Sequence, residues 1–211
     1  MIASEHIDVN DLPLEQAILE VAERLFLEKG FSLTSTTEIA KQVGCNQALI
    51  HYYFRTKENL FQKVFEPKIL EFSRAFFHID TMGGTFLERL ERMIMLHFDM
   101  MAKNPRFPFM MIREISTHPD RALQLKERLG NIPLAMMERL EADLEVAIEV
   151  GEIRPISVLN LILNVISMNA GMFLALPALT ALMDLSPEDA ERLVSSRKRE
   201  IVDTVIRSLR P

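Results

Sequence analysis

Apolar residues recur at every third or fourth position along almost the whole chain, and no useful stretch alternates apolar and polar residues as a strand does. This spacing is typical of amphipathic helices. The 211 residues also include only 7 glycines and no tryptophan, a composition that favours helices over a turn-rich sheet protein. The sequence therefore predicts an all-α fold. Its first helix should cover residues 13–29, with one apolar stripe made of Leu14, Ile18, Val21, Leu25 and Phe26.

Two short helical patterns follow, joined by a tight turn. The first begins after Ser35, whose hydroxyl can accept from the Glu38 amide while the Glu38 carboxylate reaches back to the Ser35 amide, as in a capping box. It ends before Gly44. Asn46 is a good N-cap for the second pattern, residues 47–54. Two short helices joined by a glycine-containing turn indicate a helix-turn-helix, in which the second helix enters the DNA major groove.

The second short helix is predicted to have two different faces. Ile50 and Phe54 fall on a buried side. The other side is narrow and polar, and we expect it to contact DNA. There the small Ala48 lets the backbone approach the duplex, and Gln47 can pair with adenine or contact a phosphate. The same helix offers further donors to phosphate oxygens, namely His51, Tyr52 and Tyr53.

Local charge supports a DNA-binding surface in this segment, although the chain as a whole has a net charge of −6. That net charge argues against a protein that coats nucleic acid broadly. Between Lys29 and Lys68, however, six lysine and arginine residues stand against three glutamates, a local charge of +3. Lys57 lies in the first turn of the helix that follows Thr56, where its ammonium and the exposed amides would face the same anion. A solvated helical hairpin with incidental lysines is the alternative interpretation.

Three segments of this region resemble the N-terminal domain of TetR-family transcriptional regulators, in unbroken register over about 47 residues. They are residues 18–31 (ILEVAERLFLEKGF), 36–40 (TTEIA) and 51–60 (HYYFRTKENL). The resemblance implies an all-helical homodimer with a DNA-binding domain over residues 1–56 and a ligand-binding and dimerisation domain over 57–211. The family's DNA contacts carry over onto nine positions: Ser35, Thr36, Asn46, Gln47, Ala48, His51, Tyr52, Tyr53 and Lys57.

The expected partners are therefore double-stranded operator DNA, a small-molecule effector and a second copy of the chain. Three positions depart from the family pattern. Gln47 stands where lysine or arginine is frequent, His51 where tyrosine is common, and Cys45 where valine, threonine or serine is usual. Fewer cations on this helix predict a shallower salt dependence than in relatives with lysine in place of Gln47. These departures keep open a second function, a helical protein–protein adaptor that has lost specific DNA binding.

Helical patterns continue to the end of the chain. The helix that begins at Lys57 meets Pro67, so we expect it to bend or restart near residues 64–66. Pro133 lies inside the pattern of residues 120–150, which can therefore be two helices. The other patterns cover residues 85–103, 106–117, 156–177 and 187–209.

Residues 155–183 carry no charge over 29 residues, a run long enough to cross a bilayer. Its asparagines and serines would be costly in hydrocarbon, so we expect no membrane partner. The family resemblance implies instead that the helices at about 156–177 and 187–209 form the dimer interface as a four-helix bundle. Four small or polar residues form one stripe on the first of these helices: Asn160, Asn164, Ser167 and Gly171. The stripe either lines a ligand cavity or crosses the two-fold axis of the dimer, and we favour its place in the dimer interface.

Methionines are concentrated in residues 93–101 and 107–111, which hold six of the 13 in the chain. Because methionine adapts to irregular apolar shapes, a pocket for a lipophilic effector is predicted here. The alternative is that these residues form an ordinary apolar core in which the histidine has a hydrogen-bond partner. The candidate ligand-binding residues are Met93, His97, Met100, Phe109, Asn164 and Met168.

Enzymatic motifs are absent from the sequence: it has no G-x-S-x-G, H-E-x-x-H, Walker loop or glycine fingerprint. Glu114 and His118 lie four residues apart, but no further ligand joins them at a metal-like spacing. We therefore expect neither enzyme activity nor a cofactor or metal. The single Cys45 and the lack of a signal peptide in the first dozen residues favour the cytoplasm, and the first residues should form a flexible arm.

Overall fold

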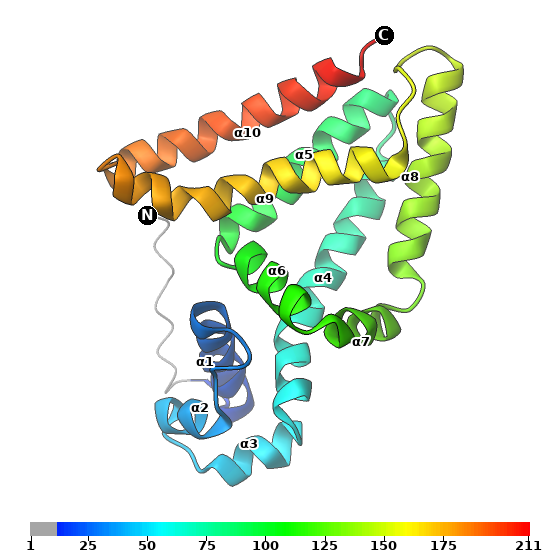
Figure 1. The fold of residues 1–211 in the computed structure, drawn as a ribbon. Helices are drawn as coiled ribbons and strands as arrows, with labels where there is room; N and C mark the ends of the chain where they lie inside the picture. Colours follow the sequence, from blue (N-terminus) through cyan, green and yellow to red (C-terminus); the bar gives the residue numbers. More distant parts are fainter. Residues whose placement is uncertain (1–11) are drawn as a thin grey trace. The chain divides into compact units, whose positions relative to one another are not determined.

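The chain forms only helices in the part that the structure describes. The computed structural model describes residues 12–211, except for ten side chains within 76–81 and 119–128. No strand occurs among these residues, which confirms the predicted all-α fold (Figure 1). The arm expected at the start of the chain lies outside the described residues. The helices are α1 (Leu14–Lys29), α2 (Thr36–Val43), α3 (Gln47–Phe54), α4 (Lys57–Thr81), α5 (Phe86–Lys103), α6 (Phe107–Thr117), α7 (Pro119–Leu129), α8 (Ile132–Glu149), α9 (Val158–Leu182) and α10 (Pro187–Leu209).

Two prolines lie inside continuous helices, and the sequence predicts a bend or restart at only one of them, Pro67. The chain stays helical through Pro67 in α4, and α9 passes Pro177 and ends at Leu182, beyond the predicted end at residue 177. Each proline removes one donor from a helix of 25 residues, and the remaining turns keep their hydrogen bonds. Pro133 acts differently, because it lies in the first turn of α8, where its missing N–H has no intrahelical partner to lose.

The chain folds into two compact units. Unit 1 combines the residues up to Glu71 with Met110–Pro119, and unit 2 combines Phe72–Phe109 with Asp120–Pro211. Two helices are continuous from one unit into the other: α4 crosses the boundary after Glu71, and α6 crosses it after Phe109. Unit 1 therefore contains the first helices of the chain together with most of α6, a segment that is distant in sequence.

Phenylalanine rings form much of the core of unit 1. The ring centroid of Phe26 in α1 lies 5.1 Å from that of Phe61 in α4 and 5.9 Å from that of Phe31, in the loop after α1. Phe31 and Phe61 meet edge to face at 5.3 Å, a favourable aromatic geometry. Ile39 of α2 and Ile50 of α3 are also buried. Burial of these side chains holds the two short helices on the unit.

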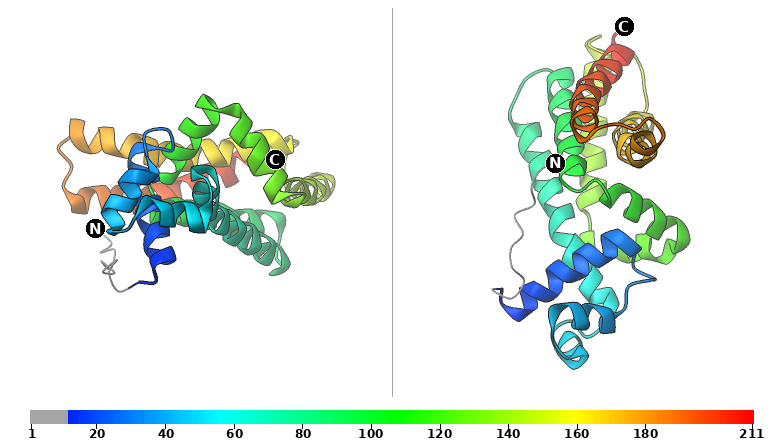
Figure 2. Two further views of the ribbon diagram at one scale, coloured as in Figure 1. Left: turned by 90° about the horizontal axis from the view of Figure 1, so that it is seen from below. Right: turned by 90° about the vertical axis from the view of Figure 1, so that its left-hand side faces the viewer.

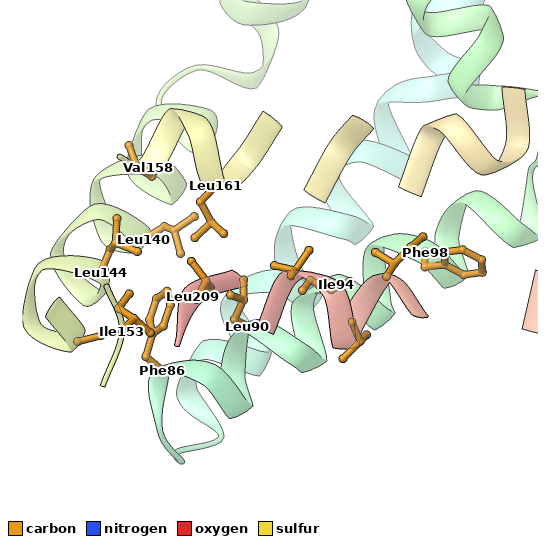
Figure 3. Close-up of a cluster of buried hydrophobic side chains, with 14 of the residues drawn as sticks. Phe86, Leu90, Ile94, Phe98, Leu140, Leu144, Ile153, Val158, Leu161 and Leu209 are labelled. Carbon is orange, nitrogen blue, oxygen red and sulfur yellow. The ribbon is translucent and has the colours of Figure 1, made fainter. Parts of the chain in front are cut away.

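Unit 2 has its own apolar core, built mainly by α5, α8, α9 and α10 (Figures 1 and 2). Figure 3 shows Leu90 and Ile94 of α5 in the same cluster as Leu161 of α9 and Leu209 of α10. On each helix these residues recur at a spacing of three or four and so share one face. α9 and α10 contact each other as a helical hairpin joined at residues 183–186.

The connector between α8 and α9 ties this core together. The Glu152 carboxylate accepts hydrogen bonds from the amides of Phe86 (3.3 Å) and Leu87 (2.9 Å), the first residues of α5. Amides at a helix N-terminus have no intrahelical partner, and an acidic side chain stabilises them. The Arg154 amide donates to the carbonyl of Leu209 at the end of α10, at 2.8 Å. The connector therefore joins the start of α5 to the end of α10.

α9 is long and apolar enough to cross a membrane, judged by length and composition alone. Among the described residues no other helix passes that test. Its most apolar window has a mean hydropathy of 1.7, and 33% of that window is buried inside the protein. Leu161, Met172 and Phe173 of α9 pack in the core of unit 2. Core packing thus accounts for part of the apolar character of this helix.

Candidate functional sites

The start of α2 is capped as the sequence predicts, but only in part. The Ser35 hydroxyl accepts a hydrogen bond from the Glu38 amide at 3.1 Å, which satisfies one of the free donors of the first turn. The Glu38 carboxylate does not complete the predicted capping box, because it pairs with the ammonium of Lys29 instead. This ion pair joins the end of α1 to the start of α2.

The turn between α2 and α3 requires a glycine. Gly44 has φ 78° and ψ 25°, in the left-handed region that side chains disfavour. The Cys45 amide closes the turn on the carbonyl of Ala40 at 2.9 Å. Asn46 then caps α3, and its side chain accepts from the amide of Ala48 at 2.9 Å. The helix-turn-helix predicted from these residues is therefore present in unit 1.

Gln47 bridges the two helices of the motif. Its Oε1 accepts a hydrogen bond from the Thr37 hydroxyl at 3.0 Å, and its Nε2 donates to the Thr36 hydroxyl at 2.9 Å. The first turn of α3 is thereby bound to the first turn of α2. Two of the predicted DNA-binding residues, Thr36 and Gln47, thus lie in contact. Thr37 was not among the predicted site residues, although its position one residue after Thr36 in the first turn of α2 could have indicated it.

The outward face of α3 is exposed, as predicted. Ile50 and Phe54 point into unit 1 and are 2% and 4% exposed. Tyr52 on the other side is 67% exposed. Thr36 is partly buried. The remaining predicted DNA-binding residues of the motif are exposed as well: Ser35, Asn46, Gln47, Ala48, His51 and Tyr53.

The sequence predicts that the Lys57 ammonium faces an external anion, but in the structure it binds within the protein. Its Nζ donates to the carbonyls of Phe31 and Thr34, each at 2.9 Å, and lies 4.1 Å from the centroid of the Phe31 ring. Carbonyl oxygens and the face of an aromatic ring both attract a cation. The ammonium therefore holds the loop between α1 and α2 against the start of α4.

Other cations of the basic segment are also paired. Lys29 pairs with Glu38, and the Nζ of Lys68 lies 2.9 Å from the Glu23 carboxylate. In the described part of the chain three cations of the segment are exposed and have no acidic partner: Lys41, Arg55 and Lys63. The positive charge that is available to an external anion is thus smaller than the sequence count suggests.

The part of α6 that belongs to unit 1 binds the same loop. The buried Glu114 carboxylate accepts from the Phe31 amide at 3.1 Å, and His118 Nε2 lies 3.2 Å from the Ser32 hydroxyl. Gly30, with φ 82°, packs so closely on Arg113 that a Cβ there would lie 1.6 Å from its guanidinium. Sequence reasoning considered Glu114 and His118 only as metal ligands, and no cluster of metal-binding residues occurs among the described side chains.

Replacing Glu114 with alanine should weaken this contact, because the buried amide of Phe31 loses its acceptor. A buried donor left without a partner costs about 2 kcal/mol. We expect the Phe31 amide to exchange its hydrogen with solvent about thirtyfold faster, a factor that corresponds to this energy. Glu114→Gln keeps an acceptor oxygen and should retain most of the protection. Equal exchange rates in the wild-type protein and Glu114→Ala would contradict the role of this bond.

One polar pair lies within the apolar core of unit 2. Asn169 of α9 is fully buried, and its Nδ2 donates to the carbonyl of Ile94 at 3.2 Å and contacts His97 Nδ1 at 2.9 Å. The imidazole of His97 lies against Phe72, with ring centroids 5.6 Å apart. Burial lowers the pKa of His97 from its ordinary 6.5 to about 4, because the low-dielectric core disfavours the charged form.

The structure brings some of the predicted ligand-binding residues together and separates others. Met93 and Met168 pack at the edge of the core that contains Ile94, and His97 lies one turn further along α5. Phe109 and Asn164 are exposed, and Met100 is partly buried. Asn169, which contacts the predicted residue His97, was not among the predicted ligand-binding residues.

The folded motif with its exposed α3 face defines a DNA-binding protein of the helix-turn-helix class. Residues 18–64 match the family model described as bacterial regulatory proteins of the tetR family. Over these residues the chain has the DNA-binding domain of the TetR family of transcriptional regulators. Helix-turn-helix DNA binding, transcription regulation and ligand binding are the properties of this family.

Known regulators are similar to different parts of the chain. The fatty acid metabolism regulator protein of Bacillus subtilis is 25% identical over 142 residues, which are 67% of this chain and 72% of that protein. The HTH-type transcriptional regulator AcrR of Shigella flexneri is 45% identical over 51 residues, 24% of each protein, so this match spans about a quarter of the regulator. These relatives are transcriptional regulators rather than enzymes.

A solved structure shows that the similarity in fold extends beyond the helix-turn-helix. The transcriptional regulator FadR from Bacillus subtilis, in complex with stearoyl-CoA, matches with a TM-score of 0.58 and 21% identity. The match covers 88% of this chain and 96% of that chain. The larger helical part after the DNA-binding motif therefore has the same fold in both proteins.

Proposed function

We propose that this protein is a one-component repressor of transcription in the cytoplasm that binds a palindromic operator as a homodimer and releases it when a lipophilic small molecule binds unit 2. The observation that carries the DNA-binding part is the exposed face of α3, held in place by the hydrogen bonds of Gln47 to Thr36 and Thr37. A rigid recognition helix loses little freedom when it enters the major groove.

The proposed complex places two copies of α3 in successive major grooves, about 34–36 Å apart. Backbone amides at the starts of α2 and α3 and the hydroxyls of Tyr52 and Tyr53 supply phosphate contacts. Lys41, Arg55 and Lys63 are the exposed cations that can add to them. Because so few lysines and arginines are available, the affinity should fall less steeply with salt than in regulators with a more basic motif.

Selection of bound sequences from a random DNA pool tests this proposal. We expect a palindrome with half-sites separated by about one helical turn. Gln47→Ala should change the preferred bases within each half-site, because it removes both a side chain suited to pair with adenine and the bridge to Thr36 and Thr37 that positions α3. Ile50→Val, a buried change on the same helix, should leave the selected sequence unchanged. Enrichment of no sequence at low salt would instead support a helical adaptor without specific DNA binding.

The exposed surface of α9 supports a homodimer. Leu159, Leu163 and Ile166 are 57%, 61% and 45% exposed, and contiguous apolar surface of this kind indicates an interface. Asn160, Asn164 and Ser167 are also exposed, so we propose that they cross the dyad rather than line the ligand site. Such a surface packs against the same surface of a second copy.

Replacing Leu163 with glutamate should dissociate this dimer. The two copies of the residue would place two buried charges at one interface, so the dimer dissociation constant should rise by at least about tenfold. Sedimentation equilibrium measures this change. Leu134→Glu, at a position on α8 that is 53% exposed, is the matched control and should remain dimeric. A Leu163→Glu protein that sediments as the wild type does would place the dimer interface elsewhere.

The proposed lipophilic effector rests on the methionines around the core of unit 2. Met93, Met101 and Met168 pack at the edge of this core, and flexible thioether side chains can make room for an apolar guest. The similarity to a fatty acid metabolism regulator and to a regulator in complex with stearoyl-CoA supports the same class of effector. α4 and α6 continue from unit 2 into unit 1, so a shift of either helix can change the position of α3.

A further inference from the structure

Gln47 begins α3 at an exposed position, yet both ends of its amide are bound to α2. The Thr37 hydroxyl donates to its Oε1 at 3.0 Å, and its Nε2 donates to the Thr36 hydroxyl at 2.9 Å. These hydroxyls belong to the first two residues of α2. One hydrogen bond would leave the amide free to rotate about that bond, whereas two bonds fix its place and its plane. Gln47 is therefore ordered before any DNA is bound.

The bridge leaves part of the amide available. An amide oxygen has two acceptor sites and an amide nitrogen has two hydrogens, and the bridge uses one of each. A hydroxyl both donates and accepts, so this count is the same in either orientation of the amide. One acceptor and one donor remain, and base edges in the major groove bind groups of both kinds.

Order in the free protein affects both the affinity and the selectivity of such a side chain. Immobilising a flexible side chain on binding lowers the affinity by roughly two- to twelvefold, and a side chain that is already held avoids most of this loss. A fixed amide also presents its donor and acceptor in one place. A base pair without the matching groups then leaves them unpaired, whereas a mobile amide can turn to suit several bases.

We propose that Thr37 is a positioning residue that acts through Gln47 and determines how strongly the protein prefers the base pair that Gln47 contacts. The inference rests on the proposed function, in which α3 enters the major groove. It adds a residue of α2 to those that determine operator selectivity. Thr37 itself needs no contact with a base for this role.

A purely structural role of the bridge predicts a different result. If the two bonds only hold α3 against α2, their loss loosens the motif and weakens binding to every sequence by the same factor. If Thr37 positions the amide, the preferred sequence loses more affinity than an altered one. The informative quantity is therefore a ratio of two dissociation constants, one for the selected operator and one for the same operator with one base pair changed. That base pair is the one whose preference responds to Gln47→Ala.

Fluorescence anisotropy with the full-length protein measures this ratio. Thr37→Val keeps the shape of the side chain but removes the hydroxyl, and it should reduce the discrimination between the two operators about fivefold. Thr37→Ser keeps the hydroxyl and should retain the wild-type ratio. Lys41→Met removes an exposed cation from the same helix. It should weaken binding to both operators equally and leave the ratio unchanged.

Two further measurements separate an effect through Gln47 from other effects. In a double-mutant cycle, Thr37→Val should not change the ratio any further once Gln47→Ala is present, because the residue on which it acts is gone. Without DNA, NMR relaxation of the Gln47 side-chain nitrogen Nε2 should show a rigid amide in the wild-type protein and in Thr37→Ser. The same amide should be more mobile in Thr37→Val.

The inference is overturned by a wild-type ratio in Thr37→Val, by an equal fall of the ratio in Thr37→Ser, or by a Gln47 amide that is as rigid in Thr37→Val as in the wild-type protein. The proposed function fails in a different way. A wild-type protein that selects no sequence would contradict the proposed function and with it this inference. A wild-type protein that selects an operator, with the same ratio in Thr37→Val, would contradict this inference alone.

Discussion

Lys57→Met is expected to destabilise unit 1 by about 3 kcal/mol, because two hydrogen bonds from an ammonium are lost at once, each contributing about 1.5 kcal/mol or more. The carbonyls of Phe31 and Thr34 both lose their donor, and the cation leaves the face of the Phe31 ring. Methionine preserves the length of the side chain and its apolar contact. Urea denaturation followed by circular dichroism measures the loss.

DNA binding by the same variant distinguishes two roles of Lys57. A lysine that binds a phosphate reduces the slope of log Kd against log salt by about 1 when it is removed. The ammonium of Lys57 is bound to the protein's own carbonyls, so we expect the slope to be unchanged while the affinity falls because the loop before α2 is loosened. Lys63→Met on the same helix is the control, and it should alter affinity without a loss of stability. A reduced slope with wild-type stability in Lys57→Met would contradict this role.

Local patterns were sufficient to predict most of the DNA-binding motif. The capping residues Ser35, Asn46 and Thr56 act within one turn of their own helix, and Gly44 supplies a conformation that one residue determines by itself. Ile50 and Phe54 follow from the helical period. The fold and the exposed face of α3 were therefore accessible from the sequence.

Contacts between distant residues were not predictable in this way. The Glu38 carboxylate pairs with Lys29 and not with its own helix, and Lys57 reaches a loop more than twenty residues away. The choice between a local and a distant partner depends on the packing of α1 against α2 and α4, for which no short sequence pattern is a guide. Pro67 shows the same limit, because the rest of α4 keeps the helix continuous across a residue that disfavours it.

The loop after α1 combines several of these distant contacts. Phe31 donates its amide to Glu114 of α6 and accepts from Lys57 of α4 through its carbonyl, while its ring packs on Phe26 and Phe61. Both α4 and α6 continue into unit 2. The two helices that continue into unit 2 therefore both bind the same residue of unit 1, Phe31.

The stability of unit 2 should decrease by about 3 kcal/mol as the pH falls from 6.5 to 4, because His97 resists protonation in the folded protein. In the unfolded chain the imidazole takes up a proton below its ordinary pKa of 6.5, whereas in the folded protein burial delays this step until a pKa of about 4. Between these values the unfolded state binds more protons, so acid favours unfolding. Below pH 4 both states are protonated at this residue, and its contribution stops changing.

Thermal unfolding at intervals between pH 4 and 7.5 measures this dependence, with a maximal slope of about 1.4 kcal/mol per pH unit from one proton. His97→Gln should remove that component, since glutamine can still accept from Asn169 but does not titrate. His51→Gln, which removes an exposed imidazole from α3, should keep the wild-type profile. A His97→Gln protein that loses stability in acid as steeply as the wild type would show that this imidazole takes up a proton as readily in the folded protein as in the unfolded chain.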